Sequence, residues 1–222
     1  MLWKPAYHYA VSILTHKQYR EIRIVYISTM YTIRGLTAHL HAIGQNHYHA
    51  IMDCQTFKGA HIYCVLNNIT SQKYGPLLES FMIQKFGYSK RSASDCVGDC
   101  SKNDENIEIK ASLGGSHHRK FNYVQLRPSH DISHYMLTAY HLNFENVGRE
   151  GDFFMFKVPK EDMKGLIAAY GGYAHGTIKE YGPITLESIN EKNNKKEYAL
   201  RPTFGDSCWQ ALLRYKIKED DL

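Results

Sequence analysis

The sequence lacks a long apolar run and has few cysteines for a chain of 222 residues. No apolar stretch approaches the roughly 20 residues that a bilayer-spanning helix needs. The first residues show no small-residue cleavage site of the kind that ends a secretory signal. The five cysteines are an odd number and lie scattered along the chain, which argues against a disulfide framework. We therefore expect a cytoplasmic protein with no membrane partner.

The sequence also lacks a strong excess of either charge. The formal net charge is +5, and residues 1–66 account for most of it, with 6 Lys/Arg against 2 Asp/Glu. Residues 151–222 carry 11 of each sign. This balance permits an anionic partner without requiring one. The 13 histidines and 17 tyrosines supply further groups that can bond phosphates and bases without raising the net charge.

Hydrophobic spacing predicts an α/β fold. Helical periodicity predicts helices over residues 17–52, 71–86, 133–141 and 160–170, with a short helix over 209–215. Strict alternation predicts strands over residues 106–112 and 121–127, and an apolar run predicts another over 153–158. Residues 171–207 read as loop-rich. We expect a mixed central β-sheet flanked by helices in one domain, residues 1–222, with a helical N-terminal part over 1–66 and the core over 67–222.

One predicted strand carries an acidic and a basic side chain on the same face. Alternation places Glu108, Lys110 and Ser112 together, while Ile107, Ile109 and Ala111 face the core. If the acidic stretch before this strand folds back as a hairpin, Asp95 or Asp99 reaches the same edge. Two carboxylates suit Mg²⁺, which prefers hard oxygen ligands, and a neighbouring lysine can position an attacking water.

An acid-x-Lys triplet alone is most often a solvated ion pair. Asp162-Met163-Lys164 is a second such triplet in this chain, and it serves as an internal control. It falls in a predicted helix, where residues two apart face different directions. The alternating strand and the upstream Gly98-Asp99 are what distinguish Glu108-Ile109-Lys110 from this control.

Gly98-Asp99 followed by Glu108-Ile109-Lys110-Ala111-Ser112 resembles the bipartite signature of the PD-(D/E)xK nucleases, and of type II restriction endonucleases in particular. The resemblance extends over residues 71–178. Three flanking segments contribute to it: the helix Gln72–Glu79, the strand Phe121–Arg127, and Tyr173-Ala174-His175-Gly176-Thr177. One departure is that Gly98 replaces the usual proline, which leaves Asp95 as a rival first ligand.

The resemblance implies a restriction-endonuclease-like core and a Mg²⁺ cofactor. It implies Asp99, Glu108, Lys110 and Glu79 as catalytic residues and Asp99, Glu108 and Ile109 as metal contacts. The implied activity is sequence-specific hydrolysis of double-stranded DNA by in-line attack of water, leaving 5′-phosphate and 3′-hydroxyl ends. A homodimer acting on a palindrome is implied too. Residues 1–66 add nothing to the resemblance, but they carry net positive charge and many apolar helix positions, so we expect them to supply dimer contacts and some DNA backbone contacts. A cognate DNA methyltransferase is expected in the same system, but not as a stable complex.

Polar side chains near the signature are interpreted as DNA contacts. They come from the Glu-x-Lys strand, the loop after it, the next strand and the Tyr173–Thr177 segment: Ser112, Ser116, His117, His118, Arg119, Lys120, Tyr123, Gln125, Arg127, His175 and Thr177. The loop and the Tyr173–Thr177 segment could equally be a solvated hairpin loop and a structural turn. The stretch Asn193–Lys196 is interpreted as a solvated turn.

Other functions remain open at this point. A repair or mismatch-type nuclease on the same fold, or a DNA-binding protein without catalysis, would share many of these residues. A one-metal His/Asn nuclease would use His134, His141 and Asn143. Cys96 and Cys100, near His117 and His118, raise the question of zinc, but their spacing is wider than the usual pairs and no second pair follows.

Overall fold

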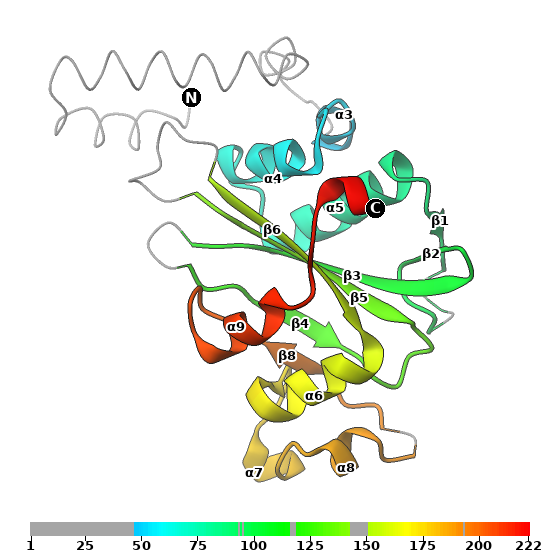
Figure 1. The fold of residues 1–222 in the computed structure, drawn as a ribbon, viewed down its shortest axis with the longest axis vertical. Helices are drawn as coiled ribbons and strands as arrows, with labels where there is room; N and C mark the ends of the chain where they lie inside the picture. Colours follow the sequence, from blue (N-terminus) through cyan, green and yellow to red (C-terminus); the bar gives the residue numbers. More distant parts are fainter. Residues whose placement is uncertain (1–46, 93, 95, 116–118, 143–150, 193) are drawn as a thin grey trace, which may run out of the picture.

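The computed structural model describes residues 47–92, 94, 96–115, 119–142, 151–192 and 194–222. A six-stranded central sheet has the order β1-β2-β3-β5-β6-β9, and a smaller sheet has the order β4-β8-β7 (Figure 1). The central strands are β1 (Ser89–Lys90), β2 (Cys100–Lys102), β3 (Glu105–Leu113), β5 (His134–His141), β6 (Asp152–Pro159) and β9 (Lys216–Ile217). The strands of the small sheet are β4 (Tyr123–Leu126), β8 (Tyr198–Leu200) and β7 (Gly172–Tyr173).

The central sheet is mixed, because β3 and β5 run parallel while the other neighbours run antiparallel. The helices are α3 (His47–Met52), α4 (Phe57–Leu66), α5 (Ser71–Lys85), α6 (Lys160–Tyr170), α7 (Ile178–Tyr181), α8 (Leu186–Ile189) and α9 (Ser207–Leu213), with a final 3₁₀ turn η2 (Glu219–Asp221). The expected α/β fold with a mixed central sheet is thus confirmed. None of these helices has the length and apolar character that crossing a bilayer requires.

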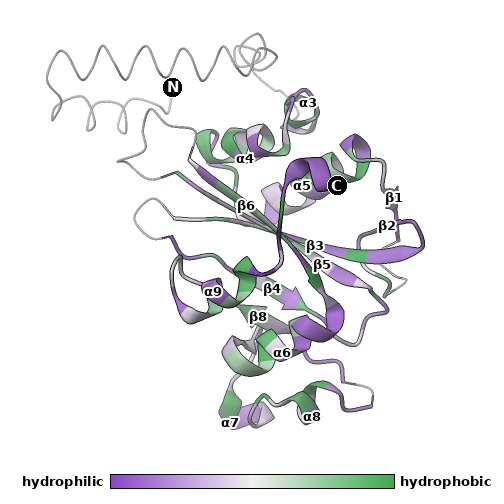
Figure 2. Cartoon of the chain, in the orientation of Figure 1, coloured by the Kyte–Doolittle hydropathy of each residue, from purple (hydrophilic) through white to green (hydrophobic). Residues whose placement is uncertain are grey.

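Two apolar clusters lie on opposite faces of the central sheet. On one face, α4 and α5 pack through Phe57 and Leu78 against Ile107, Ile109 and Met136. On the other, α6, α9 and the small sheet pack against the alternate residues of β5 and β6, with Trp209 fully buried among them. Figure 2 shows hydrophilic and hydrophobic residues mixed within α4, α5 and α6, as expected for helices with one buried side.

The prediction of a helix over residues 133–141 is wrong, because this segment is strand β5. Every residue of β5 is buried, since Tyr135 and Leu137 face one cluster while Met136 faces the other. A strand covered on both faces loses the polar–apolar alternation that identifies it. A short continuous apolar run therefore looks the same in the sequence whether it forms a buried strand or a buried helix.

The expected pairing of the strand over 121–127 with the Glu-x-Lys strand is also wrong. β4 pairs with β8, and β3 pairs with β2 and β5 instead. The alternation predicted to align Tyr123, Gln125 and Arg127 is broken by Gln125, whose φ is +57°. The predicted helices over 71–86 and 160–170 and the strand over 153–158 are confirmed as α5, α6 and β6. Most of the helix expected over 17–52 lies outside the described residues.

Candidate active site

The candidate site lies where strand β2 ends and leaves one edge of β3 open. The pairing of β2 with β3 finishes at Cys100 opposite Ile107. The Asp99 N–H still donates to the Ile107 carbonyl at 2.9 Å. Its Oδ2 then accepts a hydrogen bond from the Ile109 N–H at 2.7 Å. The predicted hairpin therefore does bring Asp99 to the Glu108 strand, while Asp95 lies outside the described residues.

Gly98 explains why this sequence departs from a proline before the aspartate. Its φ is +83°, whereas proline is fixed near −65°. A Cβ at this position would lie 2.7 Å from the Ile107 carbonyl oxygen and 2.9 Å from the Ile132 Cγ2. Glycine is thus required both by the backbone conformation and by the close approach of β3.

The open edge also exposes a backbone acceptor. The N–H and C=O of one strand residue point to the same side of the strand. Because the Ile109 N–H points to Asp99, the Ile109 carbonyl oxygen faces the same edge. No described strand pairs with this edge beyond Ile107.

Glu108 and Lys110 form a close ion pair beside Asp99. The Lys110 Nζ lies 2.5 Å from the Glu108 Oε1, and Glu108 is only 4% exposed. The Ser112 hydroxyl accepts the Asn122 N–H at 2.8 Å. In the control triplet, Lys164 instead pairs with Glu161 on the surface of α6. The two triplets therefore have different environments, as their predicted elements imply.

Helix α5 adds a third carboxylate to the same pocket. A pocket of about 480 Å³ lies between α5, β3 and β4. Its polar lining includes Tyr74, Glu79, Asp99, Glu108, Lys110, Asn122, Gln125 and Arg127. The four residues predicted to be catalytic thus line one cavity, although they come from α5, the start of β2 and β3.

Burial and neighbouring carboxylates raise the pKa of two acidic side chains in this pocket, Glu79 and Asp99. Burial, and then the charge of Asp99, raise the pKa of Glu79 to about 7. Burial and the charge of Glu108 raise the pKa of Asp99, while Lys110, the Ile109 N–H and Arg127 act in the opposite direction. Burial is the largest cause of both shifts and the neighbouring carboxylates add to it, so a cation bound beside these groups would stabilise their ionised forms.

The donor set fits a divalent cation that prefers oxygen. Asp99, Glu108 and the Ile109 carbonyl face one edge and offer oxygens only. Among the described residues, no three acidic, histidine or cysteine side chains converge as a complete cage. Water would therefore complete the coordination, which is the arrangement that Mg²⁺ favours. Glu79 is partly buried, and the charges of Asp99, Glu108 and Lys110 all affect its pKa.

Arg127 is held at the rim of the pocket by a residue that the sequence did not indicate. Its Nε and Nη2 each lie 2.7 Å from the Glu197 Oε1, and Glu197 directly precedes β8, the strand that pairs with β4. Glu197 follows Arg127 by 70 residues, and no motif links them. Tyr74 and Asn122 are two further lining residues that the analysis of the sequence missed.

The remaining predicted DNA contacts fall into several groups. Lys120 and Gln125 are exposed and line the acidic pocket. Arg119 pairs with Asp152 at 3.3 Å and lies over the Phe204 ring. Tyr123 also belongs to the pocket lining, but it is only 1% exposed and its hydroxyl donates to the Thr138 carbonyl. Ser116, His117 and His118 lie outside the described residues.

His175 and Thr177 are exposed but do not line the acidic pocket. Thr177 precedes helix α7, and its side chain makes no capping hydrogen bond there. His175 lies on a second cavity, where its Nε2 is 3.7 Å from the Glu197 Oε2. Glu197 thus contacts residues of both cavities.

The described residues do not assemble either of the two alternative metal sites, and Asn143 lies outside them. His134 and His141 begin and end β5, about 23 Å apart at 3.3 Å per residue, so they do not form one metal site. Cys100 is buried and its thiol contacts the Ile107 carbonyl, while Cys96 is exposed. Burial raises the pKa of Cys100 to about 12, and His117 and His118 lie outside the described residues.

No model of a known family matches the sequence, and no curated protein matches it. The assignment of a function therefore depends on the geometry and the chemistry of the acidic pocket.

Proposed function

We propose that this chain is a magnesium-dependent endonuclease of the PD-(D/E)xK superfamily that cuts double-stranded DNA. The observation that carries the proposal is the convergence of Glu79, Asp99, Glu108 and Lys110 on one pocket at the open edge of β3. A solvated ion pair on a strand face, which is the ordinary role of an acid-x-Lys triplet, would need neither Asp99 nor Glu79 beside it.

Each residue has a role that its contacts support. Lys110 is held against Glu108, so its ammonium group stays at the pocket and can orient a water for in-line attack on phosphorus. Arg127, held by Glu197, provides a cation at the rim that can bind a phosphate of the substrate. Asp99, Glu108 and the Ile109 carbonyl would hold Mg²⁺, which stabilises phosphate charge and lowers the pKa of bound water. Hydrolysis of the P–O3′ bond leaves 5′-phosphate and 3′-hydroxyl ends.

Within this superfamily we favour a sequence-specific type II restriction endonuclease with a restriction-endonuclease-like core. The support is the extent of the resemblance, which includes the Gly98-Asp99 and Glu108-x-Lys110 segments and the flanking α5 and β4. A homodimer and a cognate DNA methyltransferase acting separately belong to this proposal. A repair or mismatch-type nuclease is the second candidate, since the same pocket chemistry would serve it.

The acidic pocket argues against a DNA-binding protein without catalysis. Three carboxylates line it, and Glu79 and Asp99 have raised pKa values because of burial and of neighbouring negative charge. Such a pocket repels a phosphate unless a cation is bound between them. A protein that only bound the DNA backbone would not need three carboxylates beside the basic groups of this pocket.

The test is digestion of phage DNA with the purified protein and Mg²⁺, followed by sequencing of the fragment ends. Discrete fragments with one common end sequence are expected, whereas random or mismatch-dependent cuts would favour the repair nuclease. Asp99→Asn, Glu108→Gln and Lys110→Ala should each reduce the rate at least about 100-fold, as loss of a group that stabilises the transition state does.

The second acid-x-Lys triplet provides the matched control. Asp162→Asn and Lys164→Ala change the same residue types at the same spacing on α6, away from the pocket. Both variants should cleave DNA at the wild-type rate. Ca²⁺ should support DNA binding without cleavage, because its looser coordination positions water less well. Near-normal cutting by Glu108→Gln, or cutting in EDTA, would refute the proposal.

A further inference from the structure

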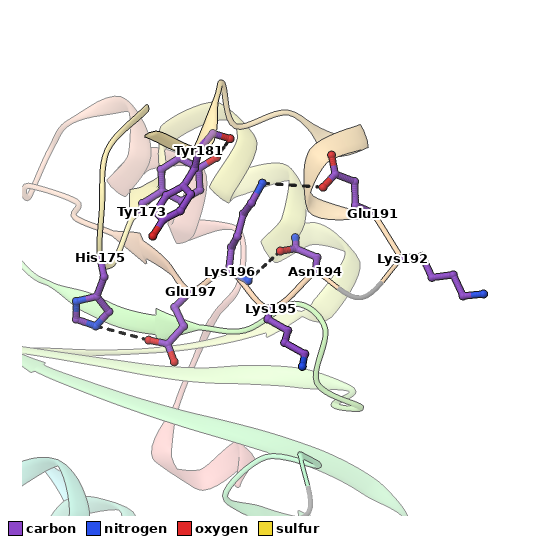
Figure 3. A pocket seen from close by; sticks show the side chains of 9 residues that line it. All are labelled: Tyr173, His175, Tyr181, Glu191, Lys192, Asn194, Lys195, Lys196 and Glu197. Carbon is purple, nitrogen blue, oxygen red and sulfur yellow. Dashed lines mark hydrogen bonds and ion pairs between the residues drawn. The ribbon is translucent and has the colours of Figure 1, made fainter. Parts of the chain in front are cut away.

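A second cavity, of about 450 Å³, lies beside the small sheet and is not used by the proposed chemistry. Tyrosine side chains form one wall, and the turn that follows α8 forms another (Figure 3). Its size is in the range of pockets that hold one small organic ligand. The residues that matter here are Tyr173, Tyr181, His175, Asn194, Lys195 and Lys196.

The aromatic wall is fixed before any ligand binds. Tyr173 is buried, its ring stacks on Tyr198 at 5.5 Å, and its hydroxyl contacts the carbonyl oxygens of Tyr181 and Gly182. The Tyr181 ring packs edge-on against Tyr173 at 5.1 Å. Tyr181 is nevertheless 40% exposed, so part of its ring is available to a planar ligand.

The basic wall is held by a buried asparagine. The Asn194 Nδ2 donates to the Ser188 and Ile189 carbonyl oxygens and contacts the Tyr198 hydroxyl, while its Oδ1 accepts the Lys196 N–H. Asn194 is 8% exposed, so the expected solvated turn is in fact anchored in the core. The anchor fixes the backbone that carries Lys195 and Lys196.

Three lysines and two glutamates line the cavity, which gives its lining a surplus of positive charge. Lys195 is exposed and makes no ion pair with a described residue. The Lys196 Nζ lies 3.9 Å from the Glu191 Oε2, which is the limit of an ion pair. The other acid of the lining, Glu197, is already held by Arg127 and His175. An anionic group is therefore favoured at the lysine side of the cavity.

The cavity is linked to the acidic pocket through one side chain. Glu197 contacts Arg127, which lines the acidic pocket, and His175, which lines the second cavity. Figure 3 shows the His175 and Glu197 side chains directed toward each other below the tyrosines. A substrate with several phosphates could reach both sites across this shared wall.

We propose that the second cavity binds a single nucleotide, with the base against Tyr181 and a phosphate at Lys195 and Lys196. Lysines alone would accept many anions, but a fixed aromatic ring beside them selects a planar base joined to a phosphate. A paired duplex is too wide to enter a cavity of this size, whereas one unpaired nucleotide fits. This inference rests on the proposed function, under which the nucleotide comes from the DNA substrate. A free mononucleotide has the same chemistry and is the other source to be tested.

The test compares two labelled duplexes of one sequence, fully paired or with a single unpaired nucleotide, in EDTA so that no cutting occurs. The wild-type full chain should bind the second duplex about tenfold more tightly, the preference that stacking of one base provides. Tyr181→Ala should abolish the preference, and Lys195→Ala should weaken it. Tyr170→Ala and Lys179→Ala are the matched controls and should keep it, since both residues are exposed but outside the cavity.

A second arm measures binding of dAMP to the same proteins. If Tyr181→Ala loses dAMP binding while both duplexes bind wild type equally, the cavity serves a free nucleotide and the DNA source is overturned. If Tyr181→Ala changes neither binding, the nucleotide site itself is overturned. A duplex preference in a protein that never cuts DNA with Mg²⁺ would support this site and refute the proposed nuclease, so the two failures remain distinguishable.

Discussion

At the scale of residues, the acidic pocket contains carboxylates whose ionisation is unfavourable and would be stabilised by a bound cation. Glu79 and Asp99 have raised pKa values because burial removes solvent from carboxylates that lie near other carboxylates. Binding sites commonly hold such groups, because a bound ion provides the missing stabilisation. Stability without a cation should therefore improve when one charge is removed.

Glu79→Gln should make the protein more stable at pH 8 in EDTA. The unfolded Glu79 ionises near 4.5 and the folded one near 7, so its contribution to stability is lost as the pH rises through this window. After allowance for solvent screening, we expect Glu79→Gln to raise the free energy of unfolding by about 2 kcal/mol at pH 8. Below pH 4.5 we expect no difference from wild type.

Urea unfolding at both pH values measures this difference. Mg²⁺ should stabilise the wild type more than Glu79→Gln, which reverses the order seen in EDTA. Glu161→Gln, on the surface of α6, is the control and should show no such gain. A Glu79→Gln variant that is less stable at pH 8 without metal would contradict the electrostatic description of the pocket.

A second residue-scale feature is the buried histidine between α4 and β5. The His61 Nδ1 donates to the Phe57 carbonyl, and its Nε2 accepts from the Thr138 hydroxyl. In this tautomer the imidazole is neutral, and burial lowers the pKa of His61 to about 4. The neutral imidazole is thus part of the core.

Acid should destabilise the fold through His61. The unfolded histidine takes up a proton near pH 6.5 and the folded one near 4, so stability is complete above 6.5 and falls toward 4. The loss expected from His61 is about 3 kcal/mol. Between pH 7 and 4, the free energy of unfolding of His61→Gln should fall by that amount less than the free energy of unfolding of wild type. His49→Gln changes an exposed residue of α3 and should show the wild-type pH dependence. Identical acid profiles for wild type and His61→Gln would disprove this assignment.

At the scale of elements, the end of the β2–β3 pairing creates the site. β2 stops at Ile107 of β3, which leaves backbone groups of the following residues facing the pocket. Asp99 then takes the place of a strand partner through the Ile109 N–H. The glycine before Asp99 allows this crossing, since any side chain would collide with β3.

Gly98→Ala should be clearly more harmful than Gly87→Ala. Both glycines have positive φ, +83° and +69°, but a Cβ at Gly87 meets nothing within 4 Å. Gly87→Ala therefore reports the backbone cost alone, about 1 kcal/mol. Gly98→Ala adds the contact with the Ile107 carbonyl and should cost about 2–4 kcal/mol in chemical unfolding.

Cleavage should separate the same two glycine variants. Gly98→Ala displaces Asp99 and should lower the rate of DNA cutting, even at a temperature where the protein remains folded. Gly87→Ala should cut normally, because it follows α5 at a distance from the pocket lining. Equal stability and equal cutting by the two variants would show that the approach of β3 is not restrictive.

At the scale of the whole molecule, the acidic pocket lies between the two layers that cover the sheet. α5 contributes Glu79 from one layer, and β4 and Arg127 contribute from the other. The described chain supplies one such pocket, which under the proposed function cuts one strand. A dimer is the simplest way to cut both strands of a two-fold symmetric DNA site, because each copy of the chain supplies one active site.

Two protomers should therefore bind one duplex. Sedimentation velocity of Glu108→Gln with a cognate duplex in Ca²⁺ measures the mass of the complex without cutting, once fragment ends have given the site. The expected species has two chains, each with one pocket at a scissile phosphate. A single chain per duplex, with two successive nicks by the wild type, would contradict the dimer and leave the hydrolytic chemistry intact.

The sequence by itself determined the local parts of this protein. The spacing of apolar residues in α5 and α6 and the alternation around Glu108 identified those elements, because each has one polar and one buried side. The aspartate and the Glu-x-Lys triplet were close enough in the chain for a hairpin to join them. These local rules predicted that Asp95 or Asp99 lies beside Glu108 and Lys110, and the family resemblance favoured Asp99.

Tertiary structure decided what local periodicity does not encode. β5 lacks the alternation typical of a strand because it is buried on both faces, and β4 pairs with β8, whose partner residues lie 72 to 77 positions further along the chain. The burial of Tyr123, the support of Arg127 by Glu197 and the cavity around Tyr181 follow from those long-range pairings. Side-chain environments arise from the packing of distant segments, and that packing is absent from the sequence of any one of them.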